Sequence, residues 1–186
     1  MELPKGLEVD IIIFINLILI FITMSNKEIV EQLVKDGCTL VKNVTVKNVT
    51  VNVLENYTRL GFTIDKEVDG FVSKDDGVTY EPAKVNVIFA SAYSIGALMK
   101  DSDEMAFAAN HLMENPAGLA IILSRAKISI VQQKVKAKES YKNPFSESAE
   151  EVVFEHDTII NHVTSIELSE FGLKKLDKLA DKMLGF

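Results

Sequence analysis

The residues with the clearest chemical potential form a basic stretch in the second half of the chain. Between positions 125 and 142 a single acid, Glu139, stands among six basic residues: Arg125, Lys127, Lys134, Lys136, Lys138 and Lys142. The alternate spacing of the middle three lysines places their ammonium groups along one side of a β-strand. Regularly spaced cations of this kind can follow the phosphates of a nucleic-acid strand. An edge strand that its lysines protect from aggregation is the alternative interpretation.

Aromatic rings accompany these cations, and unstacked bases bind to such rings. Tyr141 and Phe145 follow the lysines, in the segment expected to join the last two strands. Tyr57 and Arg59 share the solvent-facing side of an earlier strand, whereas Phe62 has the parity of the core. The sequence therefore predicts a nucleic-acid contact set of ten residues: Lys47, Tyr57, Arg59, Arg125, Lys127, Lys134, Lys136, Lys138, Tyr141 and Lys142.

A metal site at Glu155-His156-Asp157 is the main catalytic alternative. On one continuous strand His156 and His162 would share a face but lie about 20 Å apart, too far for one ion. A hairpin at positions 157–158 would bring them together. The sequence has no Walker or GxGxxG loop and no Gly-x-Ser-x-Gly elbow. We therefore expect a protein that is not an enzyme and uses no metal or other cofactor.

Composition limits the class of protein further. The 186 residues carry a net charge of −7, which argues against a uniformly basic nucleic-acid binder. The basic stretch is therefore a local feature of an acidic chain. The hydrophobic content of 47% suffices for a core, and the single cysteine, Cys38, excludes an internal disulfide.

The first 23 residues differ from the rest. The apolar run at positions 11–22 is short for a membrane span, and no basic segment or small-residue cleavage site marks a signal peptide. We expect Met24 to be the true start, with a membrane or partner anchor as the alternative. Ser25 and Glu28 then form a capping box for a helix over positions 24–38. No membrane partner is expected, and the predicted location is the cytoplasm.

Two changes of parity, one of them within a tandem repeat, predict bends in the strands. The repeated Lys-Asn-Val-Thr-Val at positions 42–51 moves its valines from even to odd positions, which predicts a bulge near Lys47-Asn48. The basic stretch changes parity in the same way. A bulge near Ile130-Val131 would align all its cations on one face. A chain reversal at Gln132-Gln133 would divide them between two strands.

The order of expected elements predicts the fold. Strands are expected at 41–53, 57–64, near 71, at 85–90, at 119–138 and over 152–168, with a helical region from about 94 to 115 that Pro116 ends. This order matches a mainly β (α+β) fold: an OB-like five-stranded barrel over 39–168 with a helix between strands three and four. An amphipathic helix over 169–186 follows, which packs on the barrel or forms a contact in a homo-oligomer.

Five short segments resemble bacteriophage single-stranded-DNA-binding proteins of the OB-fold kind. They are Lys42-Asn-Val-Thr-Val, Asn56-Tyr-Thr-Arg, Leu123-Ser-Arg-Ala-Lys-Ile, Tyr141-Lys-Asn-Pro-Phe and Phe154-Glu-His-Asp-Thr-Ile. The resemblance implies a barrel that holds single-stranded DNA in replication or recombination with little sequence preference. It also implies replication proteins as partners, but the charge-balanced C-terminus departs from the acidic tail of that family. A structural or virion-assembly protein without catalytic activity is the rival hypothesis.

Overall fold

The computed structural model describes residues 24–74, 80–99, 115–142 and 151–185. The chain separates into two compact units, Met1–Cys38 and Thr39–Phe186. Within the first, α2 (Asn26–Lys35) begins at the N-cap Ser25, whose hydroxyl and backbone complete the predicted capping box with Glu28. The predictions for positions 1–23 and for the loop at Asn143-Pro144 lie outside the described residues. None of the helices in the described residues is long and apolar enough to cross a membrane.

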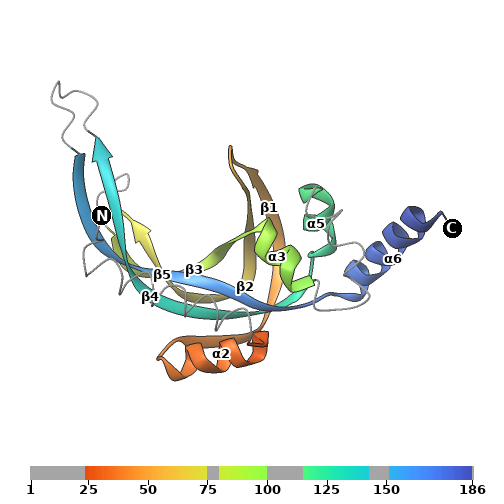
Figure 1. Ribbon diagram of the computed structural model, residues 1–186, viewed down its shortest axis with the longest axis horizontal. Helices are drawn as coiled ribbons and strands as arrows, with labels where there is room; N and C mark the ends of the chain where they lie inside the picture. Colours follow the sequence, from red (N-terminus) through yellow and green to blue (C-terminus); the bar gives the residue numbers. More distant parts are fainter. Residues whose placement is uncertain (1–23, 75–79, 100–114, 143–150, 186) are drawn as a thin grey trace, which may run out of the picture. The chain divides into compact units, whose positions relative to one another are not determined.

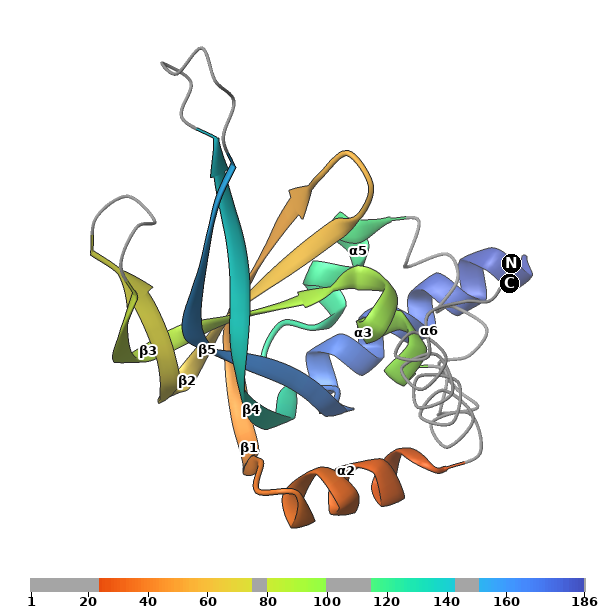
Figure 2. The ribbon, with the colours of Figure 1, turned by 60° about the vertical axis from the view of Figure 1, so that its left-hand side comes forward.

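The second unit is built on one antiparallel sheet of five strands that curls into a half-barrel (Figures 1 and 2). Neighbouring strands follow the order β3-β2-β1-β4-β5, so that β3 and β5 are the two edges. The strands span β1 (Thr39–Val53), β2 (Thr58–Ser73), β3 (Tyr80–Ser91), β4 (Lys127–Lys142) and β5 (Glu151–Glu167). Three helices of this unit are described: α3 (Ala92–Met99), α5 (Pro116–Ile122) and α6 (Glu170–Leu184).

The predicted bulge in β1 is confirmed. The register of β1 and β2 shifts between Val46 and Asn48, so Lys47 is the extra residue. Val44 and Val46 before the bulge are buried, and the alternate valines after it, Val49 and Val51, pack against the same core. A second irregularity at Asn43, with φ of 54°, bends the strand again where it pairs with β4. These bends curl the sheet around its core.

Two predictions about element boundaries are wrong. The strand expected near Phe71 is the second half of β2, which continues past a wide irregularity between Thr63 and Val68. Pro116 begins the helix α5, because the side chain of Asn115 caps the first turn and proline fits the first helical position. Consequently positions 119–122 are helical, and the basic strand begins only at Lys127. Most of the helical region predicted before Pro116 falls on positions 100–114, outside the described residues.

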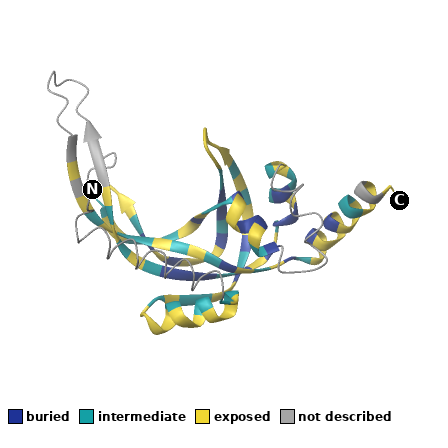
Figure 3. Cartoon of the chain, in the orientation of Figure 1, coloured by how far each residue is buried: buried dark blue, intermediate teal, exposed yellow. Residues whose placement is uncertain are grey.

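The core lies on the inner face of the curled sheet, beneath α3 and α5. Figure 3 shows buried residues along the middle of the strands and on these helices, and an exposed β1–β2 turn. The C-terminal helix α6 begins at the predicted N-cap Ser169, whose hydroxyl also donates to the Ser124 carbonyl (2.9 Å). A Cβ on Gly172 would lie within 2.3 Å of the Ile122 carbonyl oxygen, so glycine permits α6 to meet α5 backbone to backbone.

Candidate nucleic-acid interface

The basic strand is continuous, and its cations lie on two faces instead of one. β4 runs unbroken from Lys127 to Lys142, which excludes the chain reversal at Gln132-Gln133. The register with β5 does shift between Ser129 and Ile130, but the extra residue is Thr164 of β5. The predicted bulge in β4 is therefore wrong. β4 keeps its alternation, and Lys127 lies on the opposite face from the later lysines.

Lys134, Lys136 and Lys138 form what we call the lysine row. They are exposed and continue the face of β4 that carries the buried residues Ile128 and Ile130. Two carboxylates lie directly across the ladder, since Lys136 pairs with Asp157 and Lys138 with Glu155. Lys138 Nζ lies 3.1 Å from the Glu155 carboxylate. The positive charge of the lysine row is thus partly balanced by β5.

A second basic group surrounds the bulge of β1. The backbone of Arg125 donates to the Val46 carbonyl (3.1 Å), next to the exposed Lys47, while Lys127 pairs with Thr45. Arg125 has a left-handed backbone with φ of 63°. These cations belong to the outer surface of the sheet, apart from the lysine row.

The last two residues predicted to contact nucleic acid, Tyr141 and Lys142, lie at the end of β4. Their backbones pair with Val152 and Glu151 of β5, but their side chains lie outside the described part.

Arg59 has an aromatic partner that sequence reasoning missed. Its guanidinium carbon lies 4.6 Å from the centre of the Phe89 ring, a cation–π contact. Phe89 stands opposite Gly61 in the β2–β3 ladder, and a Cβ on Gly61 would lie 3.2 Å from the ring. The ring therefore lies across the glycine, with 49% of Phe89 exposed. Tyr57, which the sequence places on the same solvent-facing side as Arg59, is exposed in the turn before β2.

A groove follows the line where the two edge strands of the sheet face each other, and we call it the seam groove. Its larger hollow, of about 660 Å³, lies between positions 84–89 of β3 and 158–161 of β5, with 70–72 of β2 at one end. A smaller adjoining hollow of about 460 Å³ includes Asp69, Lys84 and Lys134. The walls are largely apolar, and Val87, Phe89 and Ile160 remain partly exposed there.

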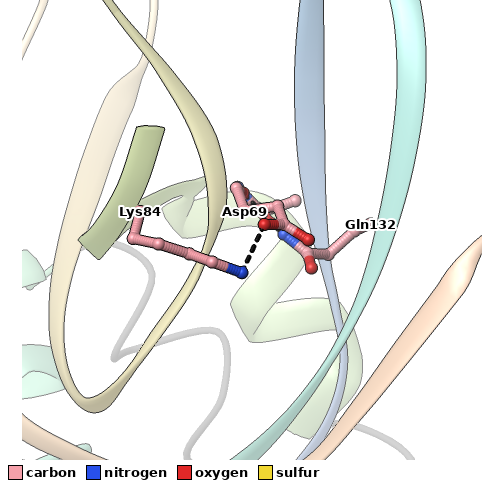
Figure 4. Close-up of polar contacts among 4 residues, drawn as sticks. Asp69, Lys84 and Gln132 are labelled. Carbon is pink, nitrogen blue, oxygen red and sulfur yellow. Dashed lines mark hydrogen bonds and ion pairs between the residues drawn. The ribbon is translucent and has the colours of Figure 1, made fainter. Parts of the chain in front are cut away.

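Polar contacts hold the strands around the seam groove. The buried amide of Gln132 donates to the backbone carbonyl of Asp69 (2.7 Å) and to the side chain of Asn161 (2.9 Å), which links β4 to β2 and β5. The Lys84 ammonium donates to the Asp69 carboxylate (2.5 Å; Figure 4), and this contact, with the charge of Lys134 as a smaller contribution, lowers the pKa of Asp69.

His156 and His162 do not lie together at one site. β5 is one strand from Glu151 to Glu167, so the hairpin that would bring His156 and His162 together is not formed. The ring of His156 stacks on Tyr80 of β3, with centroids 3.9 Å apart, and so joins the two edge strands. His162 approaches Gln133, and burial lowers its pKa. In the described residues no group of three or more His, Cys, Asp or Glu side chains could hold a metal ion.

The contact residues that sequence reasoning missed share one property. Phe89, Lys84 and Tyr80 all belong to β3, whereas the sequence predicts this strand only over 85–90 and assigns no contact residue to it. The alternation of Ile88 and Phe89 was the available signal, because it assigns the two side chains to opposite faces.

Comparison with known protein families, curated proteins and solved structures finds no match for this chain.

Proposed function

We propose that this chain is a non-enzymatic protein that binds single-stranded nucleic acid, with DNA as the ligand, on an OB-like barrel. The strand order supports this assignment, because five antiparallel strands in the order β3-β2-β1-β4-β5, with helices between β3 and β4, are compatible with the partly open OB barrel. OB barrels bind nucleic acid through strands two and three and through the loops that follow β1 and β4. In Figures 1 and 2 the β1–β2 turn and the outer end of the β4–β5 hairpin extend to the same side of the sheet.

The observation that carries the proposal is the Arg59–Phe89 pair beside the seam groove. Phe89 offers about half of its surface to solvent and also lines the groove, while Arg59 lies over its ring. A base can stack on an exposed ring, and a neighbouring guanidinium can reach its phosphate. Since every base has a flat face, such a site favours single strands and discriminates little between sequences.

The rest of the groove fits the same ligand. Val87 and Ile160 provide apolar walls for bases, and Lys134 of the lysine row lines the smaller hollow opposite Ile159 of β5. A protein of this kind would cover exposed strands during replication or recombination, in the cytoplasm of a bacterial host if the resemblance to phage proteins holds. Replication proteins would then be its partners.

The seam groove also gives the rival hypothesis a specific basis. β3 and β5 are both sheet edges, and exposed Val87 and Ile160 lie along them. An edge strand presents free backbone donors and acceptors that can pair with a strand from another protein. A structural or assembly protein would use the same groove for a partner strand. Such binding would be insensitive to salt compared with the binding of a polyanion.

The two functions are distinguished by fluorescence anisotropy with a labelled thymine oligonucleotide over a series of salt concentrations. We expect binding at low salt, with the logarithm of the affinity falling linearly with the logarithm of salt concentration. A duplex of the same length should compete weakly, because its bases are not free to stack. Absence of binding at low salt would contradict the proposal, and a folded protein that then assembles with other particle proteins would support the rival.

A further inference from the structure

The smaller hollow of the seam groove gathers charged side chains from three strands. Asp69 of β2, Lys84 of β3 and Lys134 of β4 all line it. Lys84 and Asp69 are direct partners in the β2–β3 ladder and form an ion pair. The charge of Lys134 also acts on the Asp69 carboxylate. One carboxylate therefore lies under the influence of two cations that face the groove from different strands.

Two cations on either side of an open hollow are what a phosphate group needs. A carboxylate and a phosphate are both anionic oxygen acceptors, so each can satisfy the same ammonium groups. The Lys84 and Asp69 side chains are 62% and 58% exposed, and ion pairs as exposed as this one are weak. A phosphate that enters the hollow could therefore take the place of the carboxylate at small cost.

The backbone beneath the carboxylate is held independently of the ion pair. The carbonyl of Asp69 accepts from the buried Gln132 amide, which Asn161 also binds. Figure 4 shows Lys84 and Gln132 on opposite sides of Asp69, with a dashed line for the ion pair between Lys84 and the Asp69 carboxylate. The carboxylate can thus leave Lys84 by a side-chain rotation while β2 stays in place.

We propose that Lys84 and Lys134 form a phosphate subsite of the seam groove and that Asp69 occupies this subsite when no nucleic acid is bound. The inference rests on the proposed function and adds an internal competitor to it. Asp69 would then lower the affinity for single strands and make binding reversible. Neutralising this one carboxylate should increase affinity more than neutralising any acid elsewhere on the surface.

The test compares Asp69→Asn with Glu67→Gln, which removes one negative charge from an exposed position of the same strand outside the groove. We expect Asp69→Asn to bind a labelled thymine oligonucleotide about three- to tenfold more tightly at low salt, with a salt dependence steeper by up to about 0.7. Glu67→Gln should stay within about twofold of the wild type, as expected for an exposed charge outside the site. The double variant Asp69→Asn/Lys84→Ala should lose the gain, because the subsite has then lost its cation.

A second readout follows the carboxylate itself. In the free protein the Lys84 ammonium holds the pKa of Asp69 below its ordinary value. When the oligonucleotide saturates the protein, carbon NMR of the Asp69 carboxyl should report a pKa that returns towards the ordinary value, since Lys84 has turned to phosphate. Lys84→Ala should raise the same pKa without any ligand.

The outcomes separate this inference from the proposed function. Binding by the wild type, with equal affinities for Asp69→Asn and Glu67→Gln, would overturn the subsite and leave the function standing. An unchanged Asp69 pKa in the complex would also overturn it. Absence of binding by the wild type and by Asp69→Asn at low salt would overturn both.

Discussion

The lysine row of β4 is exposed and Arg59 of the Arg59–Phe89 pair is half-buried, and the neighbours of the two groups also differ. Across the ladder from the lysine row stand Asp157 and Glu155 of β5, and one of them forms an ion pair with Lys138. Across from Arg59 stand Asn52 and Ser91, with the Phe89 ring beneath its guanidinium. Spacing along a strand decides which side a charge lies on, whereas the adjacent strand decides how much of that charge is available to a ligand.

The largest expected effect comes from removing the ring. Base–aromatic stacking contributes about 1–3 kcal/mol, so Phe89→Ala should weaken oligonucleotide binding by about 5- to 150-fold. Phe171→Ala on α6 is a matched control, because Phe171 is 43% exposed and lies under Lys175 in another cation–π contact, 5.4 Å from ring centre to Nζ. Anisotropy measures both variants. Equal losses would show that the effect is not specific to the seam groove.

The next effect concerns Gln132 of β4, whose buried amide links β4 to β2 and β5 around the seam groove. Gln132→Leu removes the buried donor to Asp69 and Asn161, and each acceptor left unsatisfied destabilises the fold. We expect a loss of about 1–3 kcal/mol in the free energy of unfolding, measured by urea denaturation. Gln133→Ala, at the neighbouring position on β4, should cost less than about 1 kcal/mol because its side chain is not buried. If Gln132→Leu destabilises the protein no more than Gln133→Ala does, the Gln132 amide does not hold the strands together.

Removing the carboxylates opposite the lysine row should make its positive charge available to a ligand. With Glu155→Gln/Asp157→Asn, Lys138 loses its ion-pair partner and Lys136 loses the carboxylate opposite it. Affinity at low salt should rise several-fold, about three to ten, and the salt dependence should steepen by up to about 1.4 for two additional phosphate contacts. Asp177→Asn/Asp181→Asn on α6 makes the same change of charge elsewhere and should have little effect. Equal gains in affinity for the two double variants would show that net charge, and not the position of the carboxylates, determines the effect.

The smallest expected effect is on the pH dependence of stability, and it concerns His162 of β5, the strand next to the lysine row. Burial lowers the pKa of His162 below its ordinary value of 6.5, and the unfolded chain regains the ordinary value. The unfolded state therefore binds the proton more readily, so stability is complete above about pH 6.5 and is lost as the pH falls through the folded-state pKa. His162→Gln should reduce the pH dependence of the urea midpoint slightly, and an unchanged profile would contradict this assignment.

Much of the fold follows from local patterns in the sequence. Ser25 with Glu28 and Ser169 mark helix starts because a cap is a contact between residues three apart. The Lys47 bulge follows from the parity of the valines, since a buried face must stay buried. The second parity change does not mark a bulge, because β4 keeps its alternation and the face that carries buried Ile128 and Ile130 becomes exposed at Lys134. Where the core ends along β4 depends on the segments that cover it, which the β4 sequence alone does not specify.

The site was predictable only in part for the same reason. Arg59 was selected because its parity faces solvent, but its ring comes from β3, about thirty positions away along the chain. The carboxylates opposite the lysine row could be identified only once the register of β4 and β5 was known. Cross-strand partners depend on pairing between distant segments, which no spacing within one segment specifies.

The most direct test of the central claim is to map the oligonucleotide on the protein by NMR chemical-shift perturbation of backbone amides and methyl groups. We expect the largest changes at positions 87–89 of β3 and 158–161 of β5, which line the seam groove, together with Arg59. Smaller changes should appear along the lysine row. Perturbations confined to the basic group around Lys47 and Arg125, or no perturbation at saturating oligonucleotide, would contradict it.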